Sequence, residues 1–198
     1  AQQFAAMHND MMDNAGLPQN PDFADPASLG EGTDWLDELL TAAPMQSLSA
    51  SFSGGNENST YYVSGNLFNQ DGIVIETGYK RYSLQFNSDH QLNDWLRFGN
   101  NLTLNHDIKT GGNYNIRNTM AALPTQAVFD EDGTYAGPTG QPIYSGDIIN
   151  PIGQARLINN KTLGYNAIGS LYGEVEILEN LKFKTSAGIQ ANFWDVRT

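Results

Sequence analysis

Residues 60–87, TYYVSGNLFNQDGIVIETGYKRYSLQFN, form two segments of alternating polarity on either side of a turn. The second segment places its large apolar side chains, from Tyr82 to Phe86, on one face and polar side chains on the other. The first segment carries apolar side chains on both faces, with Val63 on one and Phe68 on the other. Because a soluble antiparallel sheet usually keeps one face in water, this stretch raises the question of which solvents the two faces meet.

The same period of two recurs along the chain and predicts an antiparallel β structure of about six strands. The connections between these strands are, in order, short, medium, short, very long and short. The predicted strands cover residues 46–53, 60–70, 79–90, 96–104, 165–177 and 181–193.

Two features favour part of a transmembrane β-barrel: the strands are long, and the connections at one end of the strands are longer than those at the other. Strands in soluble sandwiches average about 5 to 6 residues and show no systematic difference between the two ends. Outer-membrane barrels need about 9 to 11 residues per tilted strand, with short turns on one side and longer loops on the other. Alternation alone fits both architectures, so a soluble cell-surface β-sandwich that binds glycan or protein remains the alternative.

Two short helices are expected before the first strand. Phe4, Met7, Met11 and Ala15 lie at helical spacing, and Gly16 provides a stop. A linker rich in proline and glycine follows over residues 17–32. The second helix is expected over residues 34–41, capped by Asp34 or Thr33, with Trp35 in a packing role.

The composition excludes several classes of function. With 22 acidic and ten basic residues the chain has a net charge of −12, which argues against binding to nucleic acid through phosphates. It contains no cysteine, so disulfides and thiolate chemistry are excluded. The sequence has no run of 18 apolar residues, so no transmembrane helix is predicted. Ala1 follows no initiator methionine, and the last strand runs close to the terminus, so we expect a piece of a longer protein.

No arrangement of residues predicts an enzyme, a cofactor site or a metal site. His8, His90 and His106 are far apart and lack the spacing of metal ligands, and no nucleophile elbow occurs. Residues 130–135, DEDGTY, resemble a calcium loop only in part, and a β-turn accounts for them better.

The long connection, at about residues 107–163, contains the candidate binding residues. Aromatic rings among amide-rich neighbours suit oligosaccharide binding, although aromatic residues that pack a loop have the same appearance in sequence. These rings could contact either substrate or a partner protein. The candidates are Tyr114, Phe129, Tyr135 and Tyr144.

An ordered set of phrases resembles the SusC/RagA-like family of TonB-linked outer-membrane transporters (TonB-dependent receptors). The match is collinear from about residue 17 to residue 135, and the order of the phrases carries it. They are GEGTDWLDELL at 30–40, APMQSLSASFSGGNENSTYYVSGNLFNQDGIV at 43–74, YKRYSLQFN at 79–87, DWLRFGNNLTL at 94–104 and PTQAVFDEDGTY at 124–135.

The resemblance implies an importer in the bacterial outer membrane, built as a plugged barrel of about 22 strands. Its expected partners are a SusD-like surface lipoprotein, TonB, membrane lipid and an oligosaccharide or peptide substrate. The chain departs from the family pattern because it contains neither the plug domain nor the TonB box. Residues 1–45 are then expected to connect plug and barrel, and residues 46–198 to form the first strands, with an extracellular loop at about 107–163.

Overall fold

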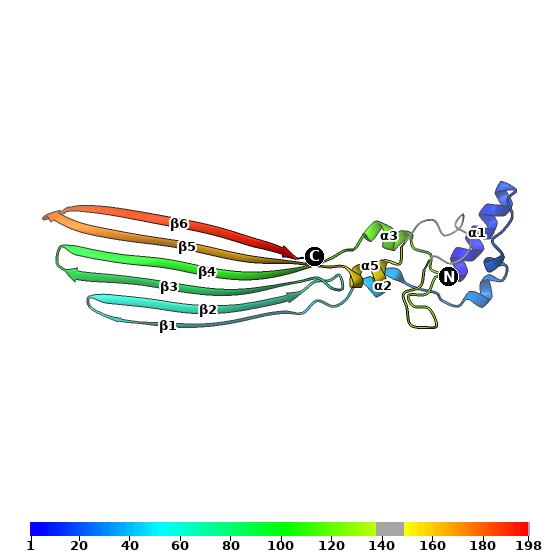
Figure 1. Ribbon diagram of the computed structural model, residues 1–198, viewed down its shortest axis with the longest axis horizontal. Coiled ribbons are helices and arrows are strands. Elements are labelled where there is room, and N and C mark those ends of the chain that lie inside the picture. Colours follow the sequence, from blue (N-terminus) through cyan, green and yellow to red (C-terminus); the bar gives the residue numbers. More distant parts are fainter. Residues whose placement is uncertain (138–148, 198) are drawn as a thin grey trace. The chain divides into compact units, whose positions relative to one another are not determined.

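The computed structural model describes residues 1–137 and 149–197, which belong to two compact units (Figure 1). We call Ala43–Gly72, Thr77–Gly111 and Asn160–Thr198 the sheet unit. Ala1–Ala42, Ile73–Glu76 and Gly112–Asn159 together make the loop unit. The loop unit is therefore assembled from three segments that are separated in sequence by the strands.

The sheet unit is one antiparallel sheet of six strands in the order of the sequence (Figure 1). This arrangement confirms the predicted all-β fold, and each predicted strand lies within an observed one. The observed strands are longer than expected. They are β1 (Met45–Asn56), β2 (Ser59–Asp71), β3 (Gly78–Asn93), β4 (Leu96–Gly112), β5 (Asn159–Leu178) and β6 (Leu181–Arg197).

The region expected to be irregular from about residue 107 to 163 is shorter than predicted. β4 continues to Gly112 because residues 107–110 pair with β3, from Arg81 back to Gly78. β5 begins at Asn159, and the described residues between the two strands include the helices α3 (Ile116–Ala121) and α5 (Pro151–Leu157). The glycines and polar residues at these strand ends resembled a loop locally, but pairing with a neighbouring strand overrides that local preference.

Successive turns are staggered along the sheet (Figure 1). Asn58 in the first turn accepts a hydrogen bond from the amide of Gln91 at 2.7 Å, and the second turn comes only after Asn93. Trp95 in the second turn accepts one from the amide of Glu176 at 2.8 Å, and the third turn follows Leu178. Each hairpin thus extends about two to three residues beyond the previous one, a tilt of roughly 40° at ~3.3 Å per residue and ~4.8 Å between strands. Closed barrels have strand tilts of this size.

No second sheet covers the apolar face within the described residues. The six strands form a single layer, and large apolar side chains on it stay exposed, with Phe52 and Ile189 each 73% accessible. A sandwich requires an opposing sheet to bury such a row. The described residues therefore do not form the sandwich of the alternative.

The two predicted helices of the N-terminal segment are present in the loop unit. α1 (Gln2–Ala15) ends at Gly16, whose left-handed backbone (φ 66°) is the expected glycine cap. α2 (Trp35–Leu39) is capped by Asp34, whose carboxylate accepts from the amides of Leu36 and Asp37 at 3.1 Å each. Two short 3₁₀ helices, η1 (Pro21–Phe23) and η2 (Pro26–Leu29), interrupt the linker.

The core of the loop unit is built around α2. Trp35 is 4% exposed, and its indole Nε1 donates to the carbonyl of Leu123 at 2.8 Å, which confirms its predicted packing role. Leu40 pairs with Val74 as an isolated bridge, and the helix therefore ends before Pro44. The buried members of this core are Trp35, Leu39, Val74, Ala122, Ile152 and Ala155.

None of the described helices is long and apolar enough to cross a membrane.

We predict that Trp35→Ala loosens the loop unit, because it leaves a cavity and an unpaired carbonyl at Leu123. The expected loss is about 3–5 kcal/mol of local stability. Hydrogen exchange of the amides around Thr119 and Gln126 in the full-length protein measures it. Met7→Ala is the matched control, because Met7 is 72% exposed. Equal exchange in both variants would contradict the packing role.

Candidate functional site: the two faces of the sheet and the loop unit

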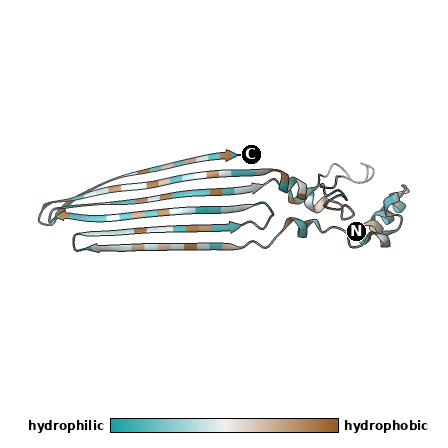
Figure 2. Ribbon diagram, turned by 60° about the horizontal axis from the view of Figure 1, so that its bottom comes forward, coloured by the Kyte–Doolittle hydropathy of each residue, from teal (hydrophilic) through white to brown (hydrophobic). Residues whose placement is uncertain are grey.

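One face of the sheet is apolar across all six strands. Cross-strand partners alternate strictly, so Leu48 lies beside Leu67, and Leu67 beside Tyr82. The same rule places Tyr165 beside Phe193. Figure 2 shows the resulting bands of alternating hydropathy along each strand. The face therefore consists of side chains that are stable in hydrocarbon and costly to expose to water.

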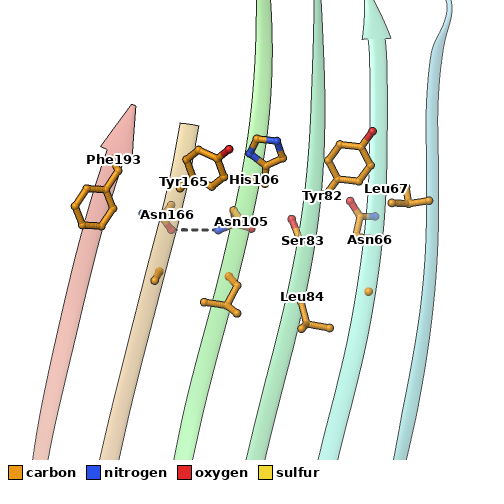
Figure 3. Close-up of a pocket in the computed structure, with 13 residues that line it drawn as sticks. Asn66, Leu67, Tyr82, Ser83, Leu84, Asn105, His106, Tyr165, Asn166 and Phe193 are labelled. Carbon is orange, nitrogen blue, oxygen red and sulfur yellow. Dashed lines mark hydrogen bonds between the residues drawn. The ribbon is translucent and has the colours of Figure 1, made fainter. Parts of the chain in front are cut away.

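An aromatic row crosses this apolar face near the strand ends that adjoin the longer connections. His106 is stacked between Tyr82 and Tyr165, with ring centroids 6.0 Å and 4.5 Å away and planes nearly parallel (Figure 3). Its Nδ1 lies 2.9 Å from the carbonyl of Gly164 and donates to it, because the carbonyl can only accept. Amphipathic rings of this kind gather at membrane interfaces.

A shallow groove of about 420 Å³ begins at this aromatic row and extends toward the middle of the strands. Gly65 and Ala167 lie in the groove, and Leu84 and Leu104 line it further. A polar substrate would find few hydrogen-bond partners in this groove, because the lining exposes mainly carbon atoms. We therefore regard it as part of the apolar surface and do not consider it a substrate site.

The opposite face carries uncharged amide and hydroxyl side chains. Asn105 donates to Asn166 at 3.2 Å (Figure 3). Asn166 in turn donates to Asn192, so three strands share one amide chain. On β2, Asn66 donates to Ser47 Oγ at 3.2 Å. These groups are stable beside water or a polar partner, which is what a barrel lumen offers. Val63 and Phe68 do point to opposite faces, as their alternation on β2 predicts.

A group of paired charges lies on the polar face near the short turns. Arg97 Nε donates to Asp89 at 2.7 Å, and Tyr172 donates its hydroxyl proton to the same carboxylate. Lys182 lies 3.5 Å from Glu174 and 3.6 Å from Glu176. Because opposite charges are paired, this end of the polar face is bridged across four strands while remaining nearly neutral.

Aromatic and cationic side chains also meet on the polar face. The Arg81 guanidinium lies 5.8 Å from the centroid of the Phe68 ring, and the ammonium of Lys184 lies 4.4 Å from that of Tyr172. Such contacts keep a large ring on a hydrated surface without an apolar partner. The contact with Arg81 explains how Phe68, an apolar residue, is accommodated on the polar face of β2.

The candidate binding residues of the long connection occupy different environments. Phe129 and Tyr135 pair as a bridge, their ring centroids are 5.1 Å apart, and Tyr135 also packs against the core of the loop unit. Tyr114 is 42% exposed. Tyr144 lies outside the described residues. The structure thus brings Phe129 and Tyr135 together, and it leaves both Phe129 (45%) and Tyr114 (42%) exposed.

Residues 130–135 form a turn, as predicted. The amide of Asp130 donates to the carbonyl of Thr134 at 2.8 Å, and Gly133 adopts a positive φ of 82°. The hydroxyl and amide of Thr134 both donate to Asp132, which lowers the pKa of that carboxyl below its usual range. Within the described residues, no three acidic or histidine side chains approach closely enough to hold a metal ion.

The comparisons with known proteins agree with this geometry. TonB-dependent receptor P26 of Formosa agariphila is 35% identical over 150 residues, which cover 76% of this chain and 15% of the relative. TonB-dependent receptor P3 of the same organism is 29% identical over 170 residues, covering 80% of this chain and 17% of the relative. No family model matches the chain.

Solved structures give the same result for the fold. A chain of the RagAB peptide importer in its closed-closed state superimposes with a TM-score of 0.66 at 25% identity. The match covers 83% of this chain and 19% of that one. A second structure of the RagAB peptide transporter gives a TM-score of 0.64. The chain belongs to the SusC/RagA-like family of TonB-dependent transporters.

Family membership settles two expectations. The six strands are part of a larger barrel, as predicted, because the matched chain contains the same strands within a much longer one. The relatives are receptors and importers and not enzymes, which confirms that prediction. The chain spans less than a fifth of the length of the relatives that it matches.

The pairing register of the strands determines which side chains become neighbours, and sequence patterns alone could not supply it. Asn105, Asn166 and Asn192 are up to 87 residues apart, and only the pairing of β4, β5 and β6 places them side by side. Likewise, nothing local to His106 indicates that it lies between two tyrosines. Period-two alternation did place Asn166 and Asn192 opposite the apolar rows of their strands, whereas Asn105 and His106 lie beyond the predicted strand 96–104.

We predict that a charge on the apolar face destabilises the protein much more than the same charge on the polar face. Leu84→Arg should cost about 2–4 kcal/mol in a lipid bilayer, because Leu84 lies mid-strand on the apolar face. The neighbouring Gln85→Arg should change the free energy of unfolding by less than about 1 kcal/mol. Urea unfolding of the full-length protein in lipid vesicles measures both. Similar costs at the two positions would show that the apolar face does not meet lipid.

Proposed function

We propose that the whole protein imports oligosaccharides or peptides across the bacterial outer membrane. The observation that carries this proposal is the two-faced, staggered sheet, with an uncovered apolar face and a neutral, hydrogen-bonding polar face. The apolar face contacts membrane lipid, and the polar face borders the lumen of the barrel. The relatives named as TonB-dependent receptors and the RagAB peptide importer support this function.

The proposed transport step is conformational and makes no covalent bond. Residues 1–45 connect the plug to the barrel, and residues 46–198 contribute its first strands. The short turns face the periplasm, and the long connection at about 107–163 is extracellular. TonB supplies energy through the plug region of the whole protein.

A SusD-like surface lipoprotein is the proposed partner on the extracellular side. The RagAB name denotes an importer of two components, which supports a partnership of this kind. Tyr114, Phe129, Tyr135 and Tyr144 are the proposed contacts with substrate or lipoprotein. Tyr114 and Phe129 are the stronger of the described three, because they are 42% and 45% exposed, whereas Tyr135 packs against the core of the loop unit.

Disruption of the full-length gene tests the function. Uptake of a fluorescent peptide library and of a fluorescent oligosaccharide mixture is measured in cells with and without the gene. At least one of the two should fall by about tenfold, and a lipoprotein should co-purify with the transporter. Unchanged uptake of both would overturn the proposal.

The same assay tests the aromatic contact. Tyr114→Ala should lower uptake several-fold, because an exposed ring in a binding site is a frequent hot spot. Tyr62→Ala, which removes a similarly exposed tyrosine of the polar face (36% accessible), is the control for removal of a ring. Wild-type uptake by the Tyr114 variant would remove Tyr114 from the site.

A further inference from the structure

The charge of this protein is concentrated in one unit. The loop unit contains 13 of the 22 acidic residues and two of the ten basic ones, a net charge of −11. The sheet unit contains the other nine acidic and eight basic residues, so its net charge is −1. Nearly the whole formal charge of −12 therefore belongs to the loop unit. Such a field raises the local concentration of cations and repels anions.

A groove of about 840 Å³ crosses the loop unit. One wall is the segment from Glu31 to Leu36, and the other runs from Thr119 on α3 to Pro124. The two walls are fixed to each other, because the Thr33 amide donates to the Pro124 carbonyl at 2.8 Å. The groove is therefore a property of the folded unit and of a size that accommodates a small ligand.

The lining of the groove combines an apolar surface with negative charge. Met120 is 69% exposed and lines the groove together with Phe4 and the largely buried Trp35. Glu31 and Asp34 are the only charged side chains that line it, and both are acidic. Asp34 is held by its capping bonds to α2, whereas no ion pair is formed by Glu31 within the described residues.

We propose that this groove binds peptides that carry a positively charged side chain next to an apolar one. The apolar side chain packs against Met120 and Phe4, and the cation lies beside Glu31. This inference rests on the proposed import function and specifies the substrate class.

Charge and geometry favour a peptide over other occupants. A second copy of the chain would bring another net charge of −11 to the same surface. A metal ion would need clustered ligands, which the described residues do not supply. A neutral oligosaccharide would gain nothing from the field of the loop unit. A short cationic peptide satisfies both the apolar lining and the acidic one.

Calorimetric titration of the full-length transporter with its lipoprotein tests the proposal. Two capped pentapeptides of alternating leucine and lysine, or leucine and glutamate, are compared at low and high salt. The lysine peptide should bind at least tenfold more tightly, and this advantage should shrink as salt screens the charges. Equal affinities would overturn the proposal.

Matched variants locate the effect in the groove. Glu31→Lys should weaken the lysine peptide about tenfold, because it places a like charge beside the bound cation. Glu131→Lys makes the same change at an exposed turn of the same unit, outside the groove, and should weaken it less than twofold. Met120→Ser should weaken both peptides and keep their ratio.

Three results would overturn the proposal. One is an equal loss in the Glu31 and Glu131 variants, which would mean that the general field attracts the peptide. Another is loss of lipoprotein co-purification in Glu31→Lys with unchanged peptide affinity, which would make the groove a protein interface. The third is equal binding of both peptides. Only the gene disruption described above bears on the import function itself, so the two failures are distinguishable.

Discussion

Backbone hydrogen bonding in an apolar solvent is the constraint on which this structure depends. A strand with a lipid-facing side cannot leave amides and carbonyls unpaired in hydrocarbon, where each costs several kcal/mol. β2 to β5 satisfy this by antiparallel pairing on both sides along 13 to 20 residues each, whereas β1 and β6 are paired on one side within the described residues. Their two faces are then free to differ, and they do: one is apolar and the other carries amides and hydroxyls. The stagger of the turns gives the tilt that a closed barrel requires.

Alternation in the sequence was sufficient to predict the strands, their number and the apolar row of most of them. It was insufficient at the ends of β4 and β5, where Thr110 and Gly111 resemble a loop but extend the sheet. Whether such residues join the sheet depends on how well they pair with a neighbouring strand. The sequence of one strand does not contain that information. The packing of Trp35 was predictable from its place on a short amphipathic helix, whereas its bond to Leu123 depends on contacts 88 residues away.

The two units divide the physical tasks of the protein. The sheet unit is nearly neutral, and its charges at the short turns are paired, as between Arg97 and Asp89. The loop unit carries the negative charge and the groove beside Glu31. A neutral, amide-lined surface lets polar molecules pass without trapping them in ion pairs, whereas an acidic unit selects by charge. In the proposed function, capture and passage would therefore rest on different chemistry in different segments of the chain.

Hydrogen exchange at the outer strands tests the central claim most directly. Among the described residues β1 pairs only with β2, and β6 only with β5. In a closed barrel both strands have a further partner, so in the membrane-embedded full-length protein every β1 and β6 amide should be protected as strongly as those of β3. Fast exchange of alternate amides along β1 or β6 would show that the sheet has a free edge, and would contradict the barrel.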